Sequence, residues 1–283
     1  MCIVLNISKS SYYEYIKGQT HNQATESGLS DELCRVFQAN KRRYGSRRLK
    51  AEMQEMGYKV GRHGVRKLLK KQGLKAIQPK SFVPKTTQSK HGLVACPNLI
   101  GIGFEAVKPN QVWISDITYI PLKHGKWAYL AAWTDLFTRK IVGWAIDTSM
   151  TQELIIIALS IGIKRYKPAS GLILHSDRGG QYFGLKFRQI VDKQQFKQSM
   201  AGTKSVYENA HAESVWATIK RELVEKGTFD SLEDAKTELF DYIEVYYNRQ
   251  RRHSALNYQS PEKFEQMYHQ NQLLNLQSKV SIK

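Results

Sequence analysis

The feature that most constrains the fold of this sequence is the order of its periodic segments after residue 110. Three β-type runs, QVWISDITYIPL, KWAYLAAWTDLF and KIVGWAIDTSM, follow one another with short polar connections, which is typical of an antiparallel meander. The apolar helical segment 151–166 comes next, then a strand that ends at Asp177, a helix, a short strand and a further helix. This order predicts an α/β fold with a mixed five-stranded sheet flanked by helices.

Two aspartates interrupt apolar strands of the predicted sheet. Asp116 lies inside WISDITYI, and Asp177 follows the strand GLILHS directly. A buried ionised Asp is costly unless a cation or a hydrogen-bond network compensates its charge. Either residue taken singly is compatible with an ordinary hydrogen-bonded strand or turn position. Two of them on strands that we expect to be neighbours favour a shared cation.

A third carboxylate is expected from the helical segment ENAHAESVWATIKREL. Glu213 lies among small residues that let a helix approach the sheet closely, and Lys220 follows two turns later on the same face. Glu208, near the helix start, and Glu222, off this face, are the competing carboxylates. Three carboxylates in one pocket suit Mg²⁺ or Mn²⁺, and two such ions activate an attacking oxygen and stabilise the leaving oxygen of a phosphodiester.

Positive charge is concentrated in the front third of the chain. The 283 residues have a net charge of +18, and residues 1–99 hold 19 Lys or Arg against 6 Asp or Glu. A basic segment of this kind points to nucleic acid, the alternative being a solubilising surface. Three widely spaced cysteines argue against a zinc knuckle or a disulfide framework and fit a reducing cytoplasm. No apolar run reaches the roughly 20 residues that a membrane span needs.

Residues 30–77 are expected to form short helices, the first of them capped by Ser30. The next two, GSRRLKAEMQEMG and GRHGVRKLLKKQGL, are bracketed by glycines and combine an apolar face with basic outer faces. This pattern predicts an all-α domain of helix-turn-helix type that binds DNA, the alternative being a solvated basic surface. The candidate DNA contacts in it are Arg47, Arg48, Arg66, Lys67, Lys70 and Lys71.

The sequence resembles the DDE transposases of the retroviral integrase superfamily. Among them it resembles the second-frame (OrfB) proteins of the insertion sequence three (IS-three) family. The resemblance is carried by WISDITYI, TDLFTRKIVGWA, LHSDRGGQY, ENAHAES, TIKREL and YYNRQRRHSALNYQSP, with YGSRRLKAEM and GVRKLLKKQGLKA at the front. It extends over nearly the whole chain. Asp177 and Glu213 are separated by 35 residues, the spacing that names the D,D(35)E motif.

The resemblance implies an RNase H-like core in which Asp116, Asp177 and Glu213 bind the catalytic Mg²⁺ or Mn²⁺ ions, expected to be two, while Lys220 holds a DNA phosphate. It implies 3′-end cleavage and strand transfer on double-stranded DNA, at insertion-sequence ends and at the target. We expect the protein to act on DNA as a homo-oligomer in the bacterial cytoplasm and to associate with the nucleoid during the reaction. An upstream-frame (OrfA) fusion partner is also expected. The family usually has Asp where this chain has Glu208.

The predicted domains follow from the resemblance and from a proline-containing stretch with little periodicity. We expect an N-terminal helical DNA-binding region at residues 1–77 with its core at 30–77, and a linker at 78–105. The RNase H-like integrase catalytic core with C-terminal helices is expected at 106–270, followed by a tail at 271–283.

A basic cluster follows the helical segment LEDAKTELFDYIEVYYN near the C-terminus. Asn248, Arg251 and His253 of this cluster are candidate DNA contacts beside the catalytic core. The alternative is that they only satisfy the helix C-terminus.

Two other functions fit parts of the same pattern. An RNase H-like metal-dependent nuclease would use the same carboxylates without strand transfer, and a DNA-binding regulator would use only the basic front region. Phosphodiester chemistry at metal ions needs no Ser, Tyr or Cys nucleophile. A zinc enzyme is disfavoured because His175 and His211 have no ligand-spaced partners.

Overall fold

The structure, a computed structural model, describes residues 8–16, 23–77, 95–101, 103–202, 210–224 and 228–280. Its contacts divide the chain into two compact units, Met1–Gln78 and Pro79–Lys283. Part of the predicted linker packs on the second unit. Ile100 is buried there, and the backbone N–H of Leu99 donates to Ser199 Oγ at 2.9 Å.

The described part of the first unit is helical. Its helices are α1 (Lys9–Ile16), α2 (Gln23–Ala39), α3 (Ser46–Glu55) and α4 (Arg62–Lys71). α3 packs against both α2 and α4. The buried face consists of the apolar residues Leu33, Val36, Phe37, Tyr44, Leu49, Met53, Val65 and Leu68. The structure confirms that a helical region precedes the sheet.

The predicted start of α2 at Ser30 is wrong, because the helix begins at Gln23. A serine marks a helix start when its hydroxyl bonds to the backbone of the first turn. Ser30 is instead buried within the helix, and its Oγ accepts a hydrogen bond from Gln72 Nε2 at 2.7 Å. This serine therefore ties α2 to the residue that follows α4.

The second unit is built on one mixed sheet with the strand order β3-β2-β1-β4-β5. The strands are β1 (Val112–Pro121), β2 (Trp127–Asp135), β3 (Ile141–Asp147), β4 (Ile173–Ser176) and β5 (Lys197–Met200). The first three are antiparallel, whereas β4 is parallel to β1 and β5 is parallel to β4. The predicted meander and the five-stranded mixed sheet are confirmed.

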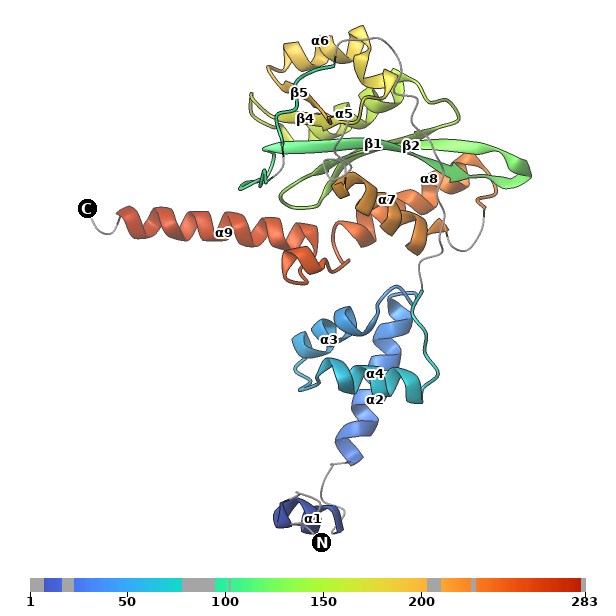
Figure 1. The fold of residues 1–283 in the computed structure, drawn as a ribbon, viewed down its shortest axis with the longest axis vertical. Helices are drawn as coiled ribbons and strands as arrows, with labels where there is room; N and C mark the ends of the chain where they lie inside the picture. The colour runs from blue at the N-terminus through green and yellow to red at the C-terminus, as the bar shows by residue number, and fades with distance from the viewer. Residues whose placement is uncertain are drawn as a thin grey trace. The chain divides into compact units, whose positions relative to one another are not determined.

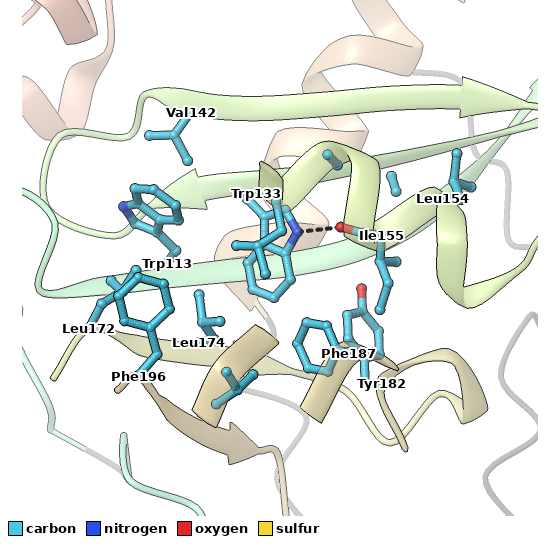
Figure 2. Close-up of a cluster of buried hydrophobic side chains, with 14 of the residues drawn as sticks. Trp113, Trp133, Val142, Leu154, Ile155, Leu172, Leu174, Tyr182, Phe187 and Phe196 are labelled. Atoms are coloured by element: carbon cyan, nitrogen blue, oxygen red, sulfur yellow. Dashed lines mark hydrogen bonds between the residues drawn. The ribbon is translucent and has the colours of Figure 1, made fainter. Parts of the chain in front are cut away.

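Helices lie on both faces of this sheet (Figure 1). α5 (Gln152–Tyr166) and α6 (Leu185–Lys193) cover one face, and α7 (Ala210–Glu222) and α8 (Leu232–Phe240) lie on the other. The main core fills the space under α5 and α6. Figure 2 shows Trp133 at its centre, where its Nε1 donates to the Ile155 carbonyl at 3.1 Å and its ring stacks on Phe187.

β3 and α5 approach each other unusually closely at Gly143. A Cβ atom added there would lie 2.1 Å from the carbonyl oxygen of Ala158. Such a contact with backbone leaves no room for any larger residue without a shift of the helix. The glycine therefore lets α5 pack closely on β3, which belongs to the same antiparallel meander as β1.

The C-terminal segment begins where α8 continues into a π-helix, Asp241–Tyr247. A short 3₁₀ turn, Ser254–Leu256, and the helix α9 (Pro261–Val280) follow. Because α9 continues to Val280, residues 271–280 of the predicted tail are helical. The described residues include no helix that is both long and apolar enough to cross a membrane.

The first turns of α9 are anchored on the loop between β2 and β3. The rings of Phe264 and Tyr268 pack on Phe137, with centroids 5.3 and 5.2 Å away. Lys140 Nζ also contacts Glu265 Oε2 at 2.7 Å, with both side chains largely buried. These contacts join the C-terminal segment to the sheet.

Candidate active site

Asp116 and Asp177 occupy matching positions on neighbouring strands. β1 and β4 are parallel, Ser115 lies opposite Ser176, and each aspartate follows its serine by one residue. Neighbouring strands lie about 4.8 Å apart. The register therefore brings these two predicted carboxylates side by side, one inside β1 and the other just past the end of β4.

Local hydrogen bonds orient both carboxylates. Asp116 Oδ1 accepts from the backbone N–H of Ile117 at 2.7 Å, and Asp177 Oδ1 accepts from that of Gly179 at 2.9 Å. A Cβ atom at position 179 would lie 3.0 Å from Asp177 Oδ1. The glycine thus lets the backbone approach the carboxylate that it holds.

Tyr182 lies near both carboxylates. It lies in the short 3₁₀ helix Gly180–Phe183, is fully buried and shares a 2.8 Å hydrogen bond with Ser115 Oγ. Burial raises the pKa of Tyr182 well above its usual value, and the charges of Asp177 and then Asp116 raise it further. Both negative charges therefore act on one phenol.

This pair of carboxylates fits a hard divalent cation. Two carboxylates on neighbouring strands repel each other unless a cation lies between them. Carboxylate oxygens are the ligands that Mg²⁺ and Mn²⁺ prefer. Among the side chains that the structure describes, no group of three or more His, Cys, Asp or Glu stands ready to hold a metal ion. A third ligand would have to come from outside that set.

α7 packs against β1 and carries the third predicted carboxylate. Its Lys220 is half-buried; burial lowers the pKa of this amine, while the charge of Asp116 opposes the shift. This interaction places the Lys220 face of α7 toward β1. Glu213 precedes Lys220 by seven residues, about two helical turns, so its backbone lies on the same face. The structure describes only the backbone of Glu213.

The two competing carboxylates are Glu208 and Glu222. Glu208 lies outside the described residues. Glu222 is buried elsewhere, where its two carboxylate oxygens accept from Arg251 and from the hydroxyl of Tyr242. Its role is therefore an ion pair within the fold.

The predicted C-terminal DNA contacts are mostly inside the protein. Arg251 is 2% exposed, and Asn248 is 3% exposed. Asn248 bonds both backbone groups of Ile141 in β3, accepting at 2.9 Å and donating at 3.0 Å. His253 is half-buried and lies 3.1 Å from Arg251 Nη1. Asn248 and Arg251 therefore bond to β3 and to Glu222, which is more than the helix C-terminal role that we gave as the alternative.

The basic residues of the front unit lie on the outer faces of α3 and α4. Arg48 is half-buried; its guanidinium lies 5.6 Å from the centroid of the Tyr44 ring, and its Nη1 donates to the Arg43 carbonyl at 3.4 Å. The other candidate contacts are exposed to solvent, and these are Arg47, Arg66, Lys67, Lys70 and Lys71. The two helices therefore present a basic surface.

Sequence reasoning missed two parts of this region. Tyr182 belongs to the site, and its place just after the Asp177 turn was the available signal. The partner of Glu222 had no local signal, because Arg251 is 29 residues away in the sequence.

Comparison with known proteins assigns both units. Two family models described as "Integrase core domain" match residues 106–205 and 194–261, and one described as "HTH-like domain" matches residues 26–82. The "Insertion element IS600 uncharacterized 31 kDa protein" of Shigella sonnei is 38% identical over 95% of this chain and 99% of its own length. The "Transposase InsF for insertion sequence IS3A" of Escherichia coli K12 is 35% identical over 94% of this chain and 92% of its own.

A solved structure of the HTLV-2 integrase catalytic core domain in complex with magnesium is also similar. It is 16% identical, covers 57% of this chain and 99% of its own, and has a TM-score of 0.45. The fold of this chain is established by its own sheet topology and by the family matches.

Proposed function

Because this chain belongs to the IS3 family of insertion-sequence transposases, with an integrase core and an HTH-like domain, we propose that it cleaves and joins DNA at the ends of an insertion sequence. The observation that carries the proposal is the register of β1 and β4, which sets Asp116 beside Asp177. The Lys220 face of α7 lies toward Asp116.

Asp116, Asp177 and Glu213 are the proposed holders of two divalent cations, Mg²⁺ or Mn²⁺. When bound, the ions polarise the phosphodiester and lower the pKa of the attacking water. The protein fixes the ligands through the Ile117 and Gly179 backbone N–H groups, which hold the two aspartates.

Lys220 is the proposed anchor for a DNA phosphate beside the metal ligands. Its amine is half-buried next to Asp116, and burial lowers its pKa. A cation held in such a place attracts a phosphate strongly, because nearby protein screens the charge less than water does.

The proposed reaction has a hydrolysis step followed by a transesterification step. Water attacks the phosphodiester at the element end, the P–O bond to the leaving 3′ oxygen breaks, and that oxygen takes up a proton to give a free 3′-OH. This hydroxyl then attacks a phosphodiester of the target, forms the new P–O bond and releases a 3′-OH of the target strand. Neither step needs a covalent bond to the protein.

The first unit is proposed to recognise the double-stranded ends. Its exposed cations release counterions from the DNA backbone when they bind it. The retained contacts are Arg47, Arg66, Lys67, Lys70 and Lys71, whereas Arg48 is partly engaged with Tyr44 and Arg43. Assembly as a homo-oligomer on DNA, joining to an upstream-frame protein, and action in the bacterial cytoplasm also belong to this proposal.

The test incubates the chain with Mg²⁺ and labelled duplexes that end in the terminal sequences flanking its gene, and then separates nicked from joined products. Joined products support the proposal. Nicked ends without joined products indicate a nuclease, and the absence of both, also when the upstream-frame protein is added, refutes the proposal.

A further inference from the structure

The helix α7 is buried on two opposite faces. One face, with the half-buried Lys220, lies where α7 packs on β1, and the charge of Asp116 on that strand acts on the amine. Successive residues of an α-helix are about 100° apart, so Glu222 lies about half a turn around the helix from Glu213. Glu222 is 4% exposed and faces the C-terminal segment.

The contacts of Glu222 are directional. Arg251 donates from Nη2 to Oε1 at 2.8 Å and from Nε to Oε2 at 2.9 Å, and the Tyr242 hydroxyl donates to Oε2 at 2.9 Å. A two-pronged guanidinium–carboxylate pair fixes orientation as well as distance. Burial opposes the charge of Arg251, but its bonds to Glu222 outweigh that effect and raise the pKa of the guanidinium.

Arg251 is itself tied to the sheet. Its backbone N–H donates to the Tyr246 carbonyl at 2.7 Å. Three residues earlier, Asn248 bonds both the N–H and the carbonyl of Ile141 at the start of β3. A continuous set of hydrogen bonds therefore leads from β3 through the C-terminal segment to α7.

Apolar packing alone does not fix the rotation of α7 about its own axis as these hydrogen bonds do. Val215, Trp216 and Ile219 of α7 are buried, but hydrophobic contact is not directional. It resists separation of the helix from its neighbours, and it limits rotation about the helix axis less sharply than a two-pronged ion pair does. The ion pair is a directional contact at the end of α7.

We propose that the Glu222–Arg251 pair is a positioning clamp that sets the rotation of α7 and thereby places Glu213 and Lys220 against Asp116. Both residues are positioning residues, since neither touches the reacting atoms. The inference rests on the proposed function, because it takes Glu213 as the third metal ligand. Loss of residues that orient metal ligands weakens metal binding by about 10- to 100-fold.

The test separates positioning from stability. In the double variant Glu222→Met/Arg251→Met, apolar side chains of similar length replace the pair, and such exchanges of buried ion pairs commonly preserve stability. The matched control is Arg249→Met/Glu262→Met, which removes the exposed pair whose atoms lie 3.8 Å apart. Mn²⁺ binding to the full chain is measured from the electron paramagnetic resonance of the free ion, and the melting temperature is measured in parallel.

We expect the clamp variant to bind Mn²⁺ about tenfold more weakly than the wild type while it melts within a few degrees of it. The control variant is expected to match the wild type in both measurements. Wild-type affinity in a folded clamp variant overturns the inference.

Arg251→Lys decides the case if the double variant does not fold. It keeps the charge and loses the fork, so we expect intermediate Mn²⁺ affinity, and wild-type affinity in it overturns the clamp. A wild-type chain that binds no Mn²⁺ refutes the proposed function and this inference together. Equal binding by wild type and variants refutes only the clamp.

Discussion

The substitution Arg251→Ala is expected to destabilise the second unit severely. The guanidinium is 2% exposed and neutralises Glu222, whose side chain is 1% exposed. Removing it leaves a buried carboxylate that keeps the hydroxyl of Tyr242 at 2.9 Å and the more distant Arg221 guanidinium at 3.6 Å. An uncompensated buried charge costs far more than the ion pair contributes, because the desolvation of the charge is no longer offset.

The expected loss follows from this geometry. Breaking a buried ion pair by removing one partner costs about 3–5 kcal/mol. For a domain of the size of the second unit, each kcal/mol lowers the melting temperature by roughly 2–4 °C. Arg251→Ala should therefore lower the melting temperature by about 6–20 °C.

Thermal and urea unfolding of the full chain measure this loss, with Arg249→Ala as the matched control. The side chain of Arg249 is 59% exposed, and its nitrogen lies 3.8 Å from Glu262. Exposed pairs of this kind contribute about 0–1 kcal/mol. If Arg251→Ala costs as little as this control, the reasoning about the buried pair is refuted.

Two other substitutions test the catalytic face and the DNA-binding face. Because burial lowers the folded-state pKa of Lys220 below its unfolded value, its charge costs stability below that folded pKa, and the cost disappears as the pH rises toward about 10.5. Lys220→Met should therefore raise the melting temperature slightly at pH 7, with a smaller gain at pH 10, and slow DNA cleavage; a lower melting temperature at pH 7 contradicts this. In the first unit, joint replacement by Gln should weaken DNA binding and reduce the slope of log affinity against log salt by about 0.9 for each lost phosphate contact, whereas an unchanged slope would mark a solvated surface. The residues replaced together are Arg47, Lys67, Lys70 and Lys71.

The strands and their order were predictable because each strand has a strong local pattern. β-branched and aromatic residues mark β1, and aromatic and apolar residues mark β2, with Trp113 and Trp133 among the buried ones. The expectation that Asp116 and Asp177 are neighbours rested on topology. The register that makes them adjacent, with Ser115 opposite Ser176, depends on pairing between strands far apart in the sequence, which no local pattern encodes.

The roles of polar residues were harder to predict, since their partners are distant. Serine is a residue type that commonly caps helices, yet the hydroxyl of Ser30 bonds to Gln72. Arginine is a residue type that commonly contacts DNA, yet Arg251 is buried against Glu222. Type and local spacing predict that such residues form hydrogen bonds. They do not predict with which partner.

The most direct test of the account is single-turnover cleavage of a labelled element end by Asp116→Asn, Asp177→Asn and Glu213→Gln, with DNA binding measured on the same samples. An amide keeps the shape of the side chain and removes the charge that binds the cation. The account predicts that all three variants bind DNA like the wild type and produce no detectable cleavage. Cleavage by Asp116→Asn or Asp177→Asn would contradict it, and cleavage by Glu213→Gln would move the third ligand to Glu208.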